Sequence, residues 1–112
     1  MPSSAMREPT FLVLAALADG RKYGYAVITE VATLSGDRVK LRPGTLYAAL
    51  DRLCDEGLVR PAGEEIVDGR LRRYYELTDA GATALATEAA RLQSNAAQAF
   101  NRLRLRPSGG AA

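Results

Sequence analysis

The chain has 112 residues, near the commonest size of a single domain, and enough to bury a modest core. It has one cysteine and no histidine, so an internal disulfide, the commonest general base and the commonest zinc ligand are all absent. We therefore expect neither an enzyme nor a metal or cofactor site. The apolar run at residues 11–18 is shorter than the ~20 residues that cross a bilayer, and we expect a cytoplasmic protein without a membrane partner. The formal net charge of +2 does not by itself indicate nucleic acid.

The first third of the chain predicts two helices after a flexible tail at residues 1–8. Pro9 opens the first helix, at 10–18, which is apolar on nearly all sides and therefore expected to be buried. Lys22 to Tyr25 predicts a turn into a second helix at 25–34. Its expected core stripe is Ile28, Val31 and Leu34. We also expect a short extended segment at 39–41, since Arg42 precedes a proline.

A third helix is predicted at 43–56, opened by a proline and ended by Gly57. Its leucines recur at helical spacing and mark one buried face: Leu46, Leu50 and Leu53. The other positions are small, polar or hydrogen-bonding, as a helix that binds in a DNA major groove requires. An ordinary amphipathic helix would show the same leucine spacing.

Two strands are predicted next, at 58–67 and 70–77, joined by the hairpin turn Asp68-Gly69. Pro61 and Gly63 place the first strand at an edge of its sheet. In the second strand Arg70 and Arg72 share one face, and the opposite face carries Leu71, Arg73 and Tyr75. A basic hairpin of this kind suits contact with DNA backbone or minor groove, although a solvated edge strand would also carry arginines.

The last helix is predicted at 78–106, with Thr78 as its cap and a disordered tail at 107–112. Its apolar residues are spaced alternately by four and three, the rhythm of a coiled-coil seam. At a rise of 1.5 Å per residue it would be about 40 Å long, more than the rest of the domain can cover. We expect dimerisation through this helix, and packing on its own core is the alternative. The seam and its neighbour are Leu85, Ala89, Leu92, Ala96, Ala99, Phe100 and Leu103.

These motifs together resemble the PadR family of bacterial transcriptional regulators, over about residues 9 to 90. The resemblance is carried by Tyr23-Gly24-Tyr25, by Pro43-Gly-Thr-Leu-Tyr47 with Glu56-Gly-Leu58, by Gly69-Arg-Leu-Arg-Arg-Tyr-Tyr75, and by Leu77-Thr-Asp-Ala-Gly81. It implies a mainly α fold with a small β-hairpin: a winged helix-turn-helix at 9–77 and a C-terminal dimerisation helix at 78–106. It also implies the short branch of the family, with a single C-terminal helix. The chain departs from the usual pattern at two positions, Arg42 and Ala48.

The function that follows is a homodimeric repressor that binds double-stranded DNA at a pseudo-palindromic operator and is released by an effector. The residues expected to contact DNA are Lys22, Tyr23, Lys40, Arg42, Gly44, Thr45, Tyr47, Arg52, Arg70, Arg72 and Arg73. The effector is expected to be a small apolar molecule or a partner protein, because no tryptophan is present to stack a planar ligand. Cys54 is expected to be a small core residue, with a redox sensor as the alternative. The alternative function is a winged-helix module for protein–protein interaction.

Overall fold

The computed structural model describes residues 6–108 of the chain. The tails predicted at 1–8 and 107–112 therefore fall largely outside the described residues. In the part of the predicted N-terminal tail that the structure describes, Met6 packs against the core and Glu8 already belongs to the first helix. In chain order the elements are α1 (Glu8–Leu17), β1 (Lys22–Tyr23), α2 (Gly24–Leu34), α3 (Pro43–Asp55), β2 (Val59–Val67), β3 (Arg70–Leu77) and α4 (Asp79–Arg104).

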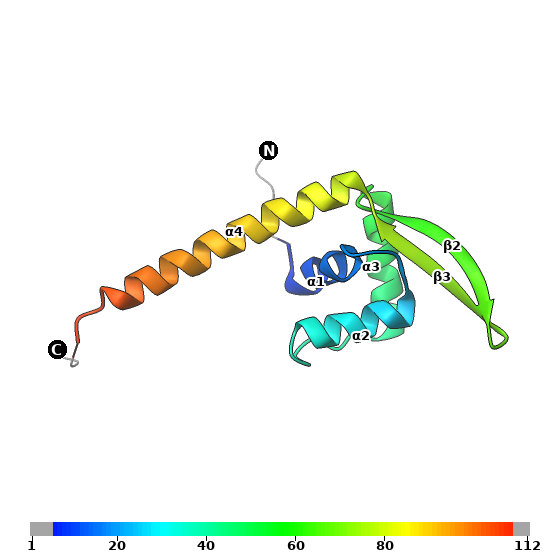
Figure 1. The fold of residues 1–112 in the computed structure, drawn as a ribbon, viewed down its shortest axis with the longest axis horizontal. Helices are drawn as coiled ribbons and strands as arrows, with labels where there is room; N and C mark the ends of the chain where they lie inside the picture. Colours follow the sequence, from blue (N-terminus) through cyan, green and yellow to red (C-terminus); the bar gives the residue numbers. More distant parts are fainter. Residues whose placement is uncertain (1–5, 109–112) are drawn as a thin grey trace.

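The core is formed where α1, α2 and α3 pack together on one face of a small sheet (Figure 1). Helix α1 is buried on several sides, as its apolar sequence predicts. The predicted stripe of α2 is right at Val31, which is completely buried, and at Ile28, which is partly buried against the core, but wrong at Leu34, which is 48% exposed. The physical reason is that the buried part of α2 ends at Val31, one turn before the helix itself ends. Val27, which is also completely buried, was not predicted.

The sheet has three antiparallel strands in the order β1-β3-β2. The predicted extended segment at 39–41 forms no strand, and the predicted turn at Lys22 and Tyr23 is instead the short strand β1. This strand exists because Tyr23 pairs with Tyr74 of β3, a partner far away in the sequence. The edge position of β2 is confirmed. Its pairing with β3 is interrupted between Pro61 and Glu64 by a bulge.

The hairpin turn is confirmed in detail. Asp68 and Gly69 both have positive φ, 52° and 75°, the geometry that suits the tight turn of a β-hairpin. Beyond the core the β2–β3 hairpin projects as a wing (Figure 1). The predicted fold, a winged helix-turn-helix followed by a long helix, is confirmed.

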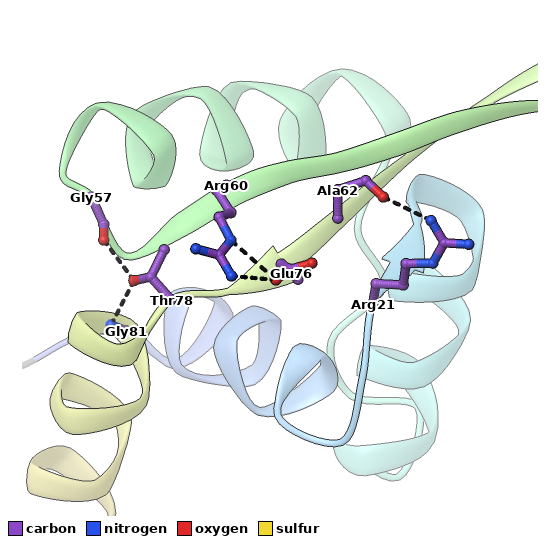
Figure 2. Close-up of polar contacts among 7 residues, drawn as sticks. All are labelled: Arg21, Gly57, Arg60, Ala62, Glu76, Thr78 and Gly81. Atoms are coloured by element: carbon purple, nitrogen blue, oxygen red, sulfur yellow. Dashed lines mark hydrogen bonds and ion pairs between the residues drawn. The ribbon is translucent and has the colours of Figure 1, made fainter.

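A short joint fixes the direction in which α4 leaves the core (Figure 2). The Thr78 hydroxyl donates to the Gly57 carbonyl oxygen at 2.6 Å and accepts from the Gly81 N–H at 3.0 Å. The Thr78 N–H donates to the carbonyl oxygen of Leu58 at 3.1 Å. Thr78 is therefore the predicted cap and also the link between α4 and the loop after α3.

Helix α4 extends well past the rest of the molecule, on the side away from the wing (Figure 1). Its first half lies on the core, where Leu85 packs against the buried cluster and Glu88 is buried beside Arg91. From Ala89 onward every described residue of α4 is exposed. No helix within residues 6–108 is long and apolar enough to span a membrane.

Candidate nucleic-acid interface

Helix α3 has one face held in the core and one face open to solvent. Leu46, Leu50 and Leu53 are completely buried, as their spacing predicts. The exposed residues of the first two turns are Arg42, Pro43, Gly44, Thr45, Tyr47 and Ala48. We call Arg42, Gly44, Thr45 and Ala48 the reading face. Arg42 is the N-cap residue and makes no side-chain capping bond, because a guanidinium has only donors and cannot accept from the N–H groups of the first turn. In helix-turn-helix proteins it is the N-terminal residues of the second helix that contact base edges.

Two predicted contact residues of α3 are instead engaged within the protein. The Tyr47 ring packs against Gly24, the first residue of α2, so closely that a Cβ at Gly24 would lie 2.7 Å from Tyr47 Cζ. Arg52 donates to the Thr10 hydroxyl at 3.1 Å and lies 3.7 Å from the Glu56 carboxylate. These side chains fasten α3 to α2 and α1, and DNA contact by either stays a prediction.

The wing carries its arginines on both faces, in the alternation that the sequence predicts. Arg70 is exposed near the tip, Arg72 lies over the Tyr23 ring at 4.3 Å, and Arg73 is 3.3 Å from the Glu64 carboxylate. Tyr75 is buried in the core, so the neighbouring Tyr74 lies on the opposite, outer face.

The two predicted lysines differ in their surroundings. Lys22 forms an ion pair with Asp19 and its side chain is largely buried, whereas Lys40 is exposed in the loop before α3. Arg21 was not predicted as a contact from the sequence. Its guanidinium lies 4.4 Å above the Tyr74 ring and donates to the carbonyl oxygen of Ala62 at 2.7 Å (Figure 2). The only sign of this role in the sequence is that Arg21 stands next to Lys22, a predicted DNA contact. The tyrosine that Arg21 covers lies more than fifty residues away.

A groove of about 450 Å³ separates the start of α1 from the flank of α3. Thr45 and Arg52 form part of one wall and Arg7 part of the other. Most of the remaining lining is apolar or small: Pro9, Thr10, Val13, Leu41, Ala48 and Ala49. One edge of the reading face is therefore accessible beside α1.

Two titratable groups near this surface, Cys54 and Tyr74, have raised pKa values. Burial, together with the charges of Asp51 and Asp55, raises the pKa of the Cys54 thiol, which opposes formation of the reactive thiolate. The Glu65 carboxylate, which accepts the hydrogen bond of the Tyr74 hydroxyl, raises the pKa of that tyrosine. Within residues 6–108 no group of three or more acidic, cysteine or histidine side chains is placed to hold a metal ion.

Residues 13–87 match the model of the transcriptional regulator PadR-like family. The chain is 44% identical over 68 residues to a transcriptional regulator of Mycobacterium tuberculosis, a segment that is 61% of this chain and 60% of that protein. It is 49% identical over 78 residues to an uncharacterised transposon protein of Streptomyces fradiae, which is 70% of this chain and 21% of that protein. The chain thus spans less than two thirds of either relative.

Solved structures show the same fold. A PadR family regulator from Clostridium difficile superposes with a TM-score of 0.66 at 25% identity, over 87% of this chain and 98% of that one. Bacillus subtilis PadR in complex with operator DNA superposes with a TM-score of 0.63 at 24% identity, over 72% of this chain and 46% of that one. With the family match across more than half of its length, this chain belongs to the PadR-like family of transcriptional regulators.

Proposed function

We propose that the protein is a homodimeric repressor that binds double-stranded DNA through α3 and the wing. The observation that carries this proposal is the composition of the reading face. Arg42, Gly44, Thr45 and Ala48 are exposed, while the leucines on the other side of α3 are completely buried. Small and polar groups allow a helix to approach base edges closely, and the arginine adds a contact for phosphate.

The rival proposal, a protein–protein interaction module, requires an exposed hydrophobic patch on α3. Within the described residues, the exposed positions of this helix carry no large aliphatic side chain, and its one aromatic, Tyr47, packs its ring against Gly24 and is 36% exposed, a single residue rather than a patch. The surface chemistry of α3 therefore favours DNA over a protein partner.

A mobility-shift assay against the DNA upstream of the protein's own gene, at two salt concentrations, tests DNA binding. We expect a specific shift that weakens steeply with salt, because phosphate contacts release counterions. The variant Thr45→Asp places a negative charge on the reading face and should weaken binding about tenfold or more, equivalent to roughly 1.4 kcal/mol. Its matched control, Thr33→Asp, makes the same change at an exposed position of α2 and should bind like the wild type. Equal binding by both variants would remove α3 from the interface.

We propose dimerisation through the second half of α4. Phe100 and Leu103 are 64% and 60% exposed, and Leu92 is also exposed, although all three lie on or beside the seam predicted from the sequence. Large apolar side chains repeated along one side of an exposed helix are stabilised when a second helix covers them. Leu85, by contrast, already packs against the protomer's own core, so the proposed contact begins after it.

Sedimentation equilibrium tests this contact with a matched pair of variants. Leu92→Asp introduces a charge on the seam and should yield monomers, whereas Ser94→Asp makes a similar change on the opposite side and should leave the dimer intact. A dimer that survives Leu92→Asp, Phe100→Ser and Leu103→Asp together would contradict dimerisation through α4.

Effector release is the remaining part of the proposal, and the family resemblance supports it. The chain has no tryptophan, so we expect a small apolar molecule or a partner protein rather than a large planar compound. Fluorescence anisotropy of the protein–DNA complex, followed while apolar compounds of increasing size are added, tests this part. Release by a small compound supports it, and release only by large planar compounds contradicts it.

A further inference from the structure

The groove between the start of α1 and the flank of α3 is lined mostly by apolar side chains. They come from Pro9 and Val13 of α1, from Leu41 of the loop before α3, and from Ala48 and Ala49 of α3. Among the described residues that line the groove, none is aromatic. A planar ligand would therefore find no ring to stack on, whereas small and branched side chains suit an aliphatic chain.

The two walls of this groove carry positive charge. Arg7 lines one wall and Arg52 the other, and no acidic side chain within residues 6–108 joins them in the lining. Glu8, which follows Arg7 in the chain, is held by the Arg38 guanidinium through hydrogen bonds at 3.0 and 2.6 Å. The apolar lining is thus combined with two guanidinium groups, which favours a ligand that has one anionic group.

Both arginines have donors available for such a group. Arg7 is exposed and makes no side-chain capping bond at the start of α1. Arg52 donates from Nη2 to the Thr10 hydroxyl at 3.1 Å, and its Nη1 lies 3.7 Å from the Glu56 carboxylate, beyond hydrogen-bond distance. A guanidinium has five N–H donors, so Arg52 is held at the wall by one of them while others remain for a carboxylate.

The size of the groove limits the length of the ligand. A water molecule takes up about 30 Å³ in the liquid, and at this volume for each non-hydrogen atom a groove of 450 Å³ holds about fifteen. The rim residues Thr45 and Ala48 are exposed, so the groove is open to solvent and a ligand would fill only part of it. A carboxylate with a chain of about eight carbons fits within these limits.

We propose that this groove binds a medium-chain aliphatic carboxylate, with its charge on Arg7 and Arg52 and its chain on the apolar lining, and that the bound ligand displaces DNA directly. Thr45 and Ala48 belong both to the groove lining and to the reading face. A ligand beside them covers the edge of α3 that would enter the major groove, so ligand and DNA exclude each other. The inference rests on the proposed DNA-binding function and assigns the effector a chemical class and a site within one protomer.

Isothermal titration calorimetry with octanoate, in the absence of DNA, tests the ligand site by itself. We expect one saturable site per protomer. Butyrate should bind at least about tenfold more weakly, because each buried methylene contributes about fourfold in affinity. Octanamide keeps the chain without the charge, and phenylacetate has the same number of carbons in an aromatic form, so both should bind more weakly than octanoate.

Matched variants test the residues of the site. Arg7→Gln should weaken octanoate binding about tenfold, whereas Arg7→Lys keeps the charge and should retain most of the affinity. Ala49→Leu fills part of the groove without changing the charge and should also weaken binding. The control is Arg60→Gln, which removes an arginine outside the groove and should bind octanoate like the wild type. Thermal unfolding checks that each variant is folded.

Amide chemical shifts locate the bound octanoate. The largest changes are expected at residues of the groove, among them Thr10, Leu41 and Ala49. Changes confined to the second half of α4 would place the ligand between protomers and overturn the proposed site.

Fluorescence anisotropy of the complex with the upstream DNA tests direct displacement. Competition for one surface has no ceiling: above the Kd for octanoate, each tenfold rise in its concentration should raise the apparent Kd for DNA about tenfold. Arg7→Gln should need about ten times more octanoate for the same relative effect.

Three results overturn the inference. They are a folded wild-type protein without saturable octanoate binding, an Arg7→Gln protein that binds octanoate as tightly as Arg60→Gln, and an apparent Kd for DNA that reaches a plateau as octanoate is added. A protein that binds octanoate in the groove but does not bind the upstream DNA even without ligand would instead contradict the proposed DNA-binding function, and displacement with it, while the ligand site would stand. The two failures are therefore distinguishable.

Discussion

The substitution Gly81→Ala tests how α4 is joined to the core. A Cβ at Gly81 would overlap the Leu58 carbonyl oxygen, and it would lie 2.9 Å from the carbonyl carbon and 2.8 Å from Leu77 Cδ1. The obstacle is mainly backbone, which cannot rotate away as a flexible side chain can. The start of α4 must therefore move, and this movement breaks the three hydrogen bonds of Thr78 at the joint.

The expected loss of stability follows from those bonds. Each contributes about 1 kcal/mol net, or about 3 kcal/mol in all. Alanine is favoured over glycine in a helix by about 1 kcal/mol, so the net loss is about 2 kcal/mol. For a domain of this size that lowers Tm by roughly 8 °C, at about 4 °C per kcal/mol.

Thermal unfolding followed by circular dichroism, at one fixed protein concentration, measures this loss. The fixed concentration is needed because dimerisation makes Tm depend on concentration. The control is Gly44→Ala, which is also in the first turn of a helix but whose added methyl group would have no neighbouring atom within 4 Å, so its Tm should stay the same or rise. A Gly81→Ala protein as stable as Gly44→Ala would refute the role assigned to the joint.

Three further outcomes are expected. Gly24→Ala should lower the Tm of the wild-type protein, because the added methyl meets the Tyr47 ring. In a Tyr47→Ala background the same substitution should lower the Tm little. Additive losses of stability in this double-mutant cycle would contradict the contact. The hydrogen bonds from Arg38 lower the pKa of the Glu8 carboxyl, so the stability that these bonds add is present above the unfolded pKa near 4.3 and is lost as the pH falls below that value. Glu8→Gln should therefore have a lower Tm than the wild type at neutral pH. A difference in Tm that is unchanged at about pH 3 would disprove this contribution. Cys54 should react with iodoacetamide more slowly than a small free thiol until urea unfolds the chain, since burial raises its pKa; rapid labelling of the native protein would favour a redox role instead.

Much of the fold could be predicted because its signals are local in sequence. The leucine spacing of α3, the proline and glycine at its ends, and the Asp68-Gly69 turn each act within a few residues, and all were confirmed. Strand β1 could not be predicted in this way. It is too short to have a pattern of its own, and only its pairing with β3 makes it a strand.

The candidate site could be predicted only in part, for the same physical reason. The sequence indicates which side chains of α3 face away from the leucines, but not which of them are engaged by neighbouring helices. Tyr47 packs against Gly24 and Arg52 bonds to Thr10, contacts that depend on how the helices cross. Arg21 was missed because its tyrosine partner comes from another strand.

Selection from a pool of random-sequence duplexes tests the central claim most directly. If α3 of each protomer reads a major groove in a dimer, the bound pool should be enriched in two inverted half-sites whose centres lie about one helical turn, ~10 base pairs, apart. The same selection with the Thr45→Asp variant should enrich no sequence. A wild-type pool that stays random, or that contains only single unrepeated half-sites, would contradict sequence-specific binding by a dimer of this protein.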